Sequence, residues 1–387
     1  MLKFSYSIPT NVHFGKGRIK VLAKEIKKYG SKVLLTYGGG SIKRNGLYDS
    51  IVEIFNENDI SFCELNGIDP NPRLTSVNEG IKICKENNID FILAVGGGSV
   101  IDCSKIIAAG YHYEGDPWDF FIGKARIKQA LPIGTILTLA ATGSEMNGNA
   151  VISNMETEEK LGTFGESLKP KFSILDPTYT MTVPVKQTAA GTADIMSHVF
   201  EQYFSPTEGA FLQDRLAEAV LKTCIEYGPI AIKNPENYEA RANLMWSSSI
   251  ALNGLLTYGK ITDWATHGME HELSAIYDIT HGIGLAILTP NWMEHVLDNG
   301  TVDKFVEYGV NVWGISLEED KYSVARKAIE KTREFFKGLG IPMTLKEVGI
   351  NEERLQEMAE KATKFRPLGG FKKLDKNDVL EIYKASL

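Results

Sequence analysis

The stretch Asp90–Gly110, DFILAVGGGSVIDCSKIIAAG, decides the fold. After Asp90, the five residues Phe91–Val95 are apolar and partly branched, as is typical of a buried strand. Three glycines and Ser99 follow, and after them the sequence continues as a helix. The stretch therefore predicts a strand that passes through a glycine turn into a helix, which is the repeating unit of a parallel sheet.

The same alternation extends through the first half of the chain. Helical patterns lie between the first three strand-like runs, and the segment 151–171 is more polar, which predicts a hairpin or an irregular excursion. The predicted strands besides Asp90–Val95 are Lys32–Tyr37, Ile60–Leu65, Ile136–Ala140 and Phe172–Pro177, and the predicted helices are Leu47–Asn58 and Leu74–Asn87. This order predicts a parallel sheet with helices on both faces.

The second half has a different character, because apolar residues there recur at helical spacing. Alanine, leucine, glutamate, lysine and methionine dominate after about Val183. Breaks are predicted at Ser205–Gly209, Gly228–Pro229, Gly314 and Gly338–Pro342. We therefore expect an α/β domain over residues 1–182 and an all-helical domain over residues 183–387.

Composition limits the classes of function. The chain has 387 residues with 42 basic and 49 acidic side chains, a net charge of −7, which argues against general nucleic-acid binding. The two long uncharged stretches, 129–144 and 242–259, contain too many polar, glycine and proline residues to span a membrane. The four cysteines form no CxxC pair, so we expect reduced thiols and a cytoplasmic protein.

The glycine turn after Val95 has the features of a phosphate site. Gly97, Gly98 and Ser99 precede a helix, whose N-terminal N–H groups attract anions. Ser99 and Asp102 also have the spacing of a capping box. The motif is neither GxGxxG nor a P-loop, and a tight turn without a ligand remains the alternative.

A second glycine run, Gly38–Gly40 followed by Ser41, ends the first predicted strand. Because strand C-terminal ends share one edge of a parallel sheet, the two runs together predict a dinucleotide. The run carries no carboxylate for a ribose hydroxyl, and Lys43 and Arg44 follow it, which favours NADP(H). The alternative is that both cations are ordinary solvated charges.

Histidine and aspartate residues in the helical half form a candidate metal site. Asp194 and His198 are four residues apart, His267 and His271 repeat that spacing, and His281 follows. A spacing of four places both side chains on one face of a helix. One carboxylate and three imidazoles suit Fe²⁺ or Zn²⁺, although the spacing does not decide which four residues bind. Ordinary hydrogen-bonded pairs remain the alternative.

These motifs together resemble the iron-containing (group III) alcohol dehydrogenases, particularly their NADP(H)-dependent butanol dehydrogenase and aldehyde reductase branch. The resemblance extends over nearly the whole chain. It rests on PTNVHFGKG (9–17), YGGGSIKRNG (37–46), PNPR (70–73), GGGSVIDCSK (96–105), TLAATGSEMN (138–147) and the histidine set. It implies a dehydroquinate-synthase-like fold, with a Rossmann-like α/β domain followed by a helical domain.

The resemblance also implies roles for individual residues. It makes His271 a proton relay beside an Fe²⁺ or Zn²⁺ ion whose ligands are Asp194, His198, His267 and His281. The implied NADP(H) contacts are Gly38, Gly39, Ser41, Asn71, Gly97, Gly98, Ser99, Asp102, Thr138, Thr142 and Lys160. The implied substrate is a primary alcohol or aldehyde such as butanol or butanal, and the implied assembly is a homodimer.

One departure and two rival functions remain. Glu270 and Glu272 replace the small or apolar residues that several relatives carry beside the histidines, which affects the polarity of the substrate pocket. The first rival is a metal-dependent lyase of the same fold. It needs several basic residues for a phosphorylated, carboxylated substrate, and only scattered ones such as Arg215, Arg241 and Lys260 occur. The second rival is a nucleotide-binding regulatory protein without turnover.

Overall fold

The computed structural model describes residues 1–317 and 320–387, which form two compact units. The α/β unit contains residues 7–183 and 235–249, and the helical unit contains residues 1–6, 184–234 and 250–387. Residues 1–6 and 235–249 thus belong to the opposite units from those predicted by their position in the sequence. The first segment binds the helical unit through Leu2, whose N–H donates to Gly259 O at 2.8 Å. The second segment adds Met245 to the core of the α/β unit.

Six parallel strands form the central sheet of the α/β unit. In spatial order they are β1 (Asn11–Phe14), β8 (Phe172–Leu175), β5 (Ile133–Leu137), β4 (Phe91–Gly96), β2 (Lys32–Tyr37) and β3 (Ser61–Leu65). A separate antiparallel hairpin consists of β6 (Asn149–Asn154) and β7 (Glu159–Phe164). The parallel sheet was predicted, and the hairpin falls in the polar segment where one was expected.

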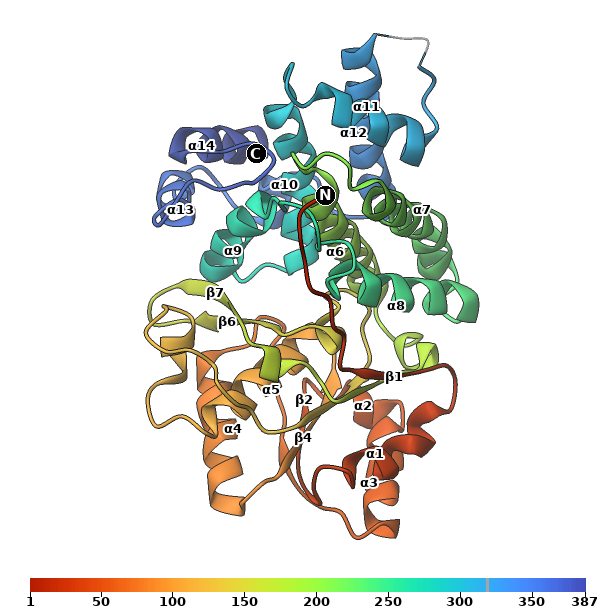
Figure 1. Ribbon diagram of the computed structural model, residues 1–387, viewed down its shortest axis with the longest axis vertical. Helices are drawn as coiled ribbons and strands as arrows, with labels where there is room; N and C mark the ends of the chain where they lie inside the picture. Colours follow the sequence, from red (N-terminus) through yellow and green to blue (C-terminus); the bar gives the residue numbers. More distant parts are fainter. Residues whose placement is uncertain (318–319) are drawn as a thin grey trace. The chain divides into compact units, whose positions relative to one another are not determined.

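Side-chain alternation along the strands creates a hydrophobic core on each face of the sheet. Val33 and Leu35 pack with α1 (Leu22–Ile26) and α3 (Leu47–Glu57), whereas Leu34 packs with α4 (Leu74–Asn87) and α5 (Gly98–Gly110). Figure 1 shows these two helix pairs on opposite sides of β2 and β4. A parallel sheet is stable only when both faces are covered in this way.

One predicted strand has the wrong bounds, and one strand was not predicted. The strand predicted at Ile136–Ala140 begins earlier, at Ile133, because Ile133 and Gly134 pair with Ile92 and Leu93 of β4. The edge strand β1 was missed, since it has only four residues with two apolar side chains and pairs with β8 at the edge of the sheet. Short helices occupy the connections: α2 (Ser41–Arg44), η1 (Arg18–Val21), η2 (Pro117–Phe120), η3 (Ser144–Met146), η4 (Glu166–Leu168), η5 (Pro177–Thr180) and, in the helical unit, η6 (Lys346–Val348).

Long helices make up the helical unit. They are α6 (Val185–Tyr203), α7 (Phe211–Lys233), the end of α8 (Tyr238–Leu252), α9 (Ala265–Tyr277), α10 (His281–Val296), α11 (Val302–Trp313), α12 (Lys321–Gly338), α13 (Leu355–Ala362) and α14 (Lys376–Ala385). The break predicted at Gly228–Pro229 was wrong, because α7 continues through both residues. Gly228 packs closely against α6, where an added Cβ would lie 2.9 Å from Thr192. Tertiary packing of this kind overrides the local preference of proline and glycine. Within the described residues, no helix is both long and apolar enough to cross a membrane.

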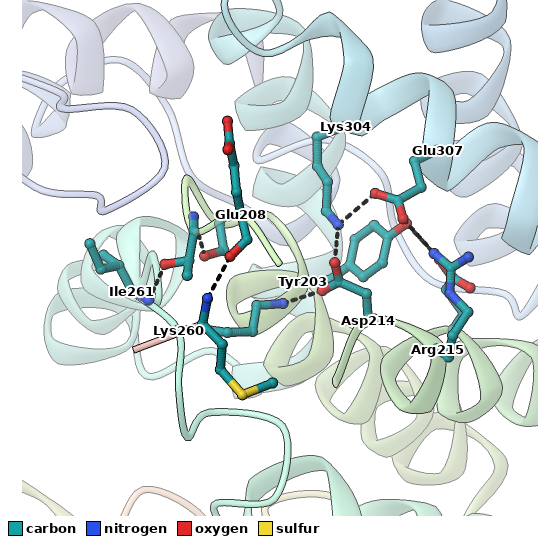
Figure 2. A network of polar contacts seen from close by, with 12 residues as sticks. Tyr203, Glu208, Asp214, Arg215, Lys260, Ile261, Lys304 and Glu307 are labelled. Carbon is teal, nitrogen blue, oxygen red and sulfur yellow. Dashed lines mark hydrogen bonds and ion pairs between the residues drawn. The ribbon is translucent and has the colours of Figure 1, made fainter. Parts of the chain in front are cut away.

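A group of ion pairs, which we name the Asp214 cluster, connects α7, α11 and the segment before α9 (Figure 2). Lys304 Nζ lies 2.8 Å from Asp214 Oδ2 and 2.7 Å from Glu307 Oε2. Lys260 contacts the other oxygen of Asp214, and Arg215 contacts Glu307. Each carboxylate here has a lysine or arginine partner, so the cluster compensates its own buried charge.

Candidate metal centre and nucleotide-binding turn

The turn between β4 and α5 is built by close packing against the segment after β5. An added Cβ at Gly98 would lie 2.3 Å from Thr142 Oγ1, and one at Gly97 would lie 3.1 Å from Leu139. The N–H of Thr138 donates to Gly96 O at 3.0 Å. The structure thus brings together four residues that we predicted to contact the cofactor, namely Gly97, Gly98, Thr138 and Thr142.

The predicted capping box is absent from this turn, so that prediction was wrong. The N-cap of α5 is Gly97, which has no side chain, and Ser99 lies inside the first turn. Its hydroxyl donates to the carbonyl of Pro70, beside the predicted cofactor residue Asn71. Asp102 instead accepts from Ser144 Oγ at 2.5 Å and from the N–H of Val151 at 2.9 Å. Asp102 therefore anchors the segment that begins η3 and the hairpin, whose buried Lys160 is another predicted contact.

A buried lysine, which the sequence analysis did not single out, holds this segment. Lys105 is fully buried and donates to Ser144 Oγ at 2.7 Å, Asn147 Oδ1 at 3.1 Å and Asn149 O at 2.8 Å. Burial lowers its pKa to about 8, although the carboxylates of Asp102 and Glu145 oppose the shift. The three hydrogen bonds stabilise the loop that follows Thr142.

The second glycine run follows β2, and the lysine after it, Lys43, has a carboxylate neighbour that was not expected. An added Cβ at Gly38 would lie 3.2 Å from the carbonyl oxygen of Ile68, so only glycine fits well there. Lys43 Nζ lies 3.6 Å from Glu64 Oε2 and 4.4 Å from the ring centre of Tyr48. Lys43 is therefore paired with a carboxylate from β3, which is 21 residues away in sequence and outside any local motif.

Three predicted metal ligands meet at one point in the helical unit. Donor atoms of Asp194 on α6, His267 on α9 and His281 on α10 all lie within 4.8 Å of one another. His198, one turn after Asp194, places Nδ1 at 3.3 Å from Asp194 Oδ1, and its ring centre lies 4.6 Å from that of His267. All four predicted ligands therefore belong to one group, which we name the histidine cluster.

The protonation chemistry of the cluster suits a divalent metal. Both ring nitrogens of His267 are buried: Nδ1 faces Glu201 Oε1 at 3.3 Å, and Nε2 has no hydrogen-bond partner among the described residues. Burial, followed by the charges of His267 and His281, lowers the pKa of His198 well below its usual value, which favours the neutral ligand form. Burial alone lowers the pKa of His267, but nearby carboxylates, Glu201 first, raise it by more. Oxygen and imidazole donors of this kind fit Fe²⁺ or Zn²⁺.

His271 lies beside the cluster but outside the first group of donors. Its ring centre is 6.5 Å from that of His267 and 5.8 Å from that of His281. It forms a second group of metal-ligating type with Glu270 and His281. The half-buried ring is thus placed near the predicted ligands without being one of the first three.

Two carboxylates contact the histidine cluster: Glu201, for which no role was predicted, and Glu270, which was expected only to affect the polarity of the substrate pocket. Glu201 faces His267, and Glu270 faces His281. A signal was present, since Glu201 follows His198 by three residues and Glu270 follows His267 by three, spacings that share a helix face. Only the folded chain shows that each glutamate points at a histidine of another helix.

Two family models cover most of the chain. Residues 9–177 match the iron-containing alcohol dehydrogenase model, and residues 188–387 match the C-terminal model of the Fe-containing alcohol dehydrogenase family. The chain belongs to the iron-containing alcohol dehydrogenase family.

The similar proteins include butanol dehydrogenases and an aldehyde reductase. The chain is 61% identical to NADH-dependent butanol dehydrogenase A of Clostridium acetobutylicum, with 100% of both chains covered. It is 41% identical to the NADPH-dependent aldehyde reductase YqhD of Escherichia coli, with 93% of both covered. A crystal structure of NADH-dependent butanol dehydrogenase A from Thermotoga maritima matches with a TM-score of 0.96 at 41% identity, covering 100% of this chain and 99% of that one.

Proposed function

We propose that the protein is a metal-dependent oxidoreductase that interconverts a small primary alcohol and its aldehyde, such as butanol and butanal, using a nicotinamide cofactor. The observation that carries this proposal is the convergence of Asp194, His267 and His281, with the buried Nε2 of His267 lacking a hydrogen-bond partner among the described residues. The names of the butanol dehydrogenase and aldehyde reductase relatives support the substrate class.

The residues of the histidine cluster would hold the metal, which we propose is Fe²⁺, with Zn²⁺ as the alternative. Asp194, His198, His267 and His281 would be its ligands. When bound, such an ion polarises an alcohol or carbonyl oxygen and stabilises negative charge there. His271 lies outside the ligand set and would hold the exchanged proton on its ring before passing it to solvent.

The direct test mixes anaerobically purified protein, loaded with Fe²⁺ or Zn²⁺, with butanol and NADP⁺ or NAD⁺. We expect the absorbance of reduced nicotinamide to increase with time. A metal-loaded protein that reduces neither cofactor would contradict the proposal. Turnover of a substrate without net cofactor reduction would instead indicate a lyase.

For the cofactor, we propose that NADP(H) is preferred. Support comes from Gly39, where nothing lies within 4 Å of an added Cβ, from the lack of a carboxylate at Gly38 and Gly39, and from the nearby cations Lys43 and Arg44. Two considerations point the other way, because relatives at 61% and 60% identity are named NADH-dependent and Glu64 already pairs with Lys43. The kcat/KM ratio for NADPH over NADH tests the proposal, and a ratio of one or less would refute it.

Variants separate the two influences on this ratio. Gly39→Asp should lower it, because a carboxylate repels a 2′-phosphate. Glu64→Gln should raise it about two- to fivefold, the effect expected of one half-exposed ion pair that no longer competes for Lys43. Glu57→Gln, at the exposed end of α3, is the control and should leave the ratio unchanged.

We also propose a cytoplasmic homodimer. Among the described residues β1 pairs with β8 alone, and an unpaired edge can accept a strand from a second copy of the chain. All four cysteines are free, which fits a reducing compartment. Light scattering that gives the mass of one chain, 42.8 kDa, would contradict the dimer.

A further inference from the structure

Two buried carboxylates face the Nδ1 atoms of two predicted metal ligands. Glu201 of α6 is 1% exposed, and its Oε1 lies 3.3 Å from His267 Nδ1 while accepting the backbone N–H of His267 at 2.9 Å. Glu270 of α9 is 0% exposed, and its Oε2 contacts His281 Nδ1. Its other oxygen accepts from the hydroxyl of Ser274. Each glutamate thus faces the Nδ1 side of an imidazole, and in His281 the opposite nitrogen, Nε2, is the one near Asp194.

A glycine on α10 leaves space for the side chain of Glu270. Gly284 lies on α10, where an added Cβ would be 2.8 Å from Glu270 Cγ and 3.1 Å from Glu270 Oε1. Any larger residue at this position would displace the carboxylate from His281. The glycine in the sequence ITHGIG therefore has a specific role, which is to leave space for a buried charge.

Each contact determines which nitrogen of the ring carries the proton. A carboxylate accepts a hydrogen bond, so the Nδ1 atoms of His267 and His281 carry hydrogen and each Nε2 keeps its lone pair. His281 Nε2 lies 3.8 Å from Asp194 Oδ1, and His267 Nε2 is buried without a hydrogen-bond partner among the described residues. The lone pairs are therefore available on the atoms that a metal would use.

We propose that Glu201 and Glu270 are positioning residues that fix the tautomer and ring orientation of His267 and His281. They connect three helices, since Glu201 of α6 orients a ligand on α9 and Glu270 of α9 orients a ligand on α10. Carboxylates behind metal-bound histidines raise the basicity of the ligand, and their loss weakens metal binding. This inference rests on the proposed metal centre.

The test measures metal affinity directly rather than turnover. Metal-free protein is titrated with Co²⁺ in competition with a chelator, and the absorption spectrum of bound Co²⁺ is recorded. We expect Glu201→Gln and Glu270→Gln to raise the dissociation constant about 10-fold and Glu270→Ala about 100-fold. Gly284→Ala, which leaves the carboxyl group present but displaces it, should weaken binding in the same direction.

The matched control is Glu272→Gln. Glu272 is also buried on α9, but its carboxylate lies 3.5 Å from Lys361 rather than against a predicted ligand. Its Co²⁺ affinity should stay within twofold of the parent protein. Unfolding curves of all variants without metal check that the fold is retained.

Three results would overturn the inference. Unchanged Co²⁺ affinity in both glutamine variants would show that the carboxylates do not act on the ligands. An equal loss in Glu272→Gln would show a general effect of charge. A changed coordination number in the Co²⁺ spectrum of Glu270→Gln would make Glu270 a ligand, in the second group with His271 and His281. If the parent protein binds no Co²⁺, Fe²⁺ or Zn²⁺, the proposed function itself fails.

Discussion

The helical unit contains two buried polar clusters whose carboxylates have different partners. In the Asp214 cluster the partners are lysine and arginine, as in the pair between Lys304 and Asp214 at 2.8 Å (Figure 2). In the histidine cluster the groups that face Glu201 and Glu270 are imidazoles, which need not be charged. Burying charge is costly unless it is compensated. The first cluster therefore supplies its own cations, whereas the second is suited to a cation from solution.

The largest expected effect tests the histidine cluster directly. Asp194→Ala or His267→Ala should abolish bound metal and lower alcohol oxidation at least about 10³-fold, because several kcal/mol of charge stabilisation are lost. Metal analysis and a steady-state assay measure both quantities. Circular dichroism should show an intact fold, and full activity in a metal-free variant would refute the site.

A substitution in the Asp214 cluster should instead lower stability and leave metal binding unchanged. Lys260→Met removes a buried cation and leaves Asp214 with less compensation, so the free energy of unfolding should fall by about 3–5 kcal/mol. Denaturant unfolding measures this loss. Metal content per folded molecule should be unchanged, and a variant of normal stability would show that Lys260 contributes no net compensation.

Asp263 lies in sequence between Lys260 of the Asp214 cluster and His267 of the histidine cluster, and its partners are backbone N–H groups. Its carboxylate accepts the backbone N–H groups of Ala265, Gly370 and Phe371. Burial, and then the charge of Glu201, raises its pKa from 3.8 to about 6. Because the folded state holds this proton more tightly, the contribution of Asp263 to stability is full below about pH 4 and is lost as pH rises to about 6.

This shift predicts a stability change of up to about 3 kcal/mol between those pH values. The difference in unfolding free energy between the parent protein and Asp263→Asn measures it, since the amide does not titrate. We expect the parent to lose stability relative to the variant as pH increases from 4 to 6. A difference that is constant with pH would contradict the raised pKa.

The smallest effect distinguishes the predicted ligands of the histidine cluster from His271, which lies beside it. His271→Phe should retain metal but slow turnover about 10²-fold and change the pH profile of kcat, because a group that holds the proton is removed. Metal analysis with a pH–rate profile tests both points. An unchanged profile would leave His271 with a packing role only.

The sequence predicted the elements whose patterns are local. The helix 74–87 and the strand 32–37 have the bounds expected, because the helix repeats apolar residues at helical spacing and the strand contains a short apolar run that is buried on both faces. It failed where packing decides, as at Gly228–Pro229, where close contact with Thr192 keeps α7 continuous. It also failed at Ser99, whose hydroxyl binds Pro70 rather than capping α5.

The same division applies to the candidate site. Spacing alone placed Asp194 with His198 and His267 with His271, because residues four apart share a helix face. Whether His267 or His271 meets Asp194 depends on the rotation of α9 against α6, which no local pattern records. The partners Glu201, Glu270 and Glu64 likewise come from neighbouring elements. The sequence by itself determined which side chains can bind a metal or a phosphate, whereas tertiary packing alone decided which of them converge.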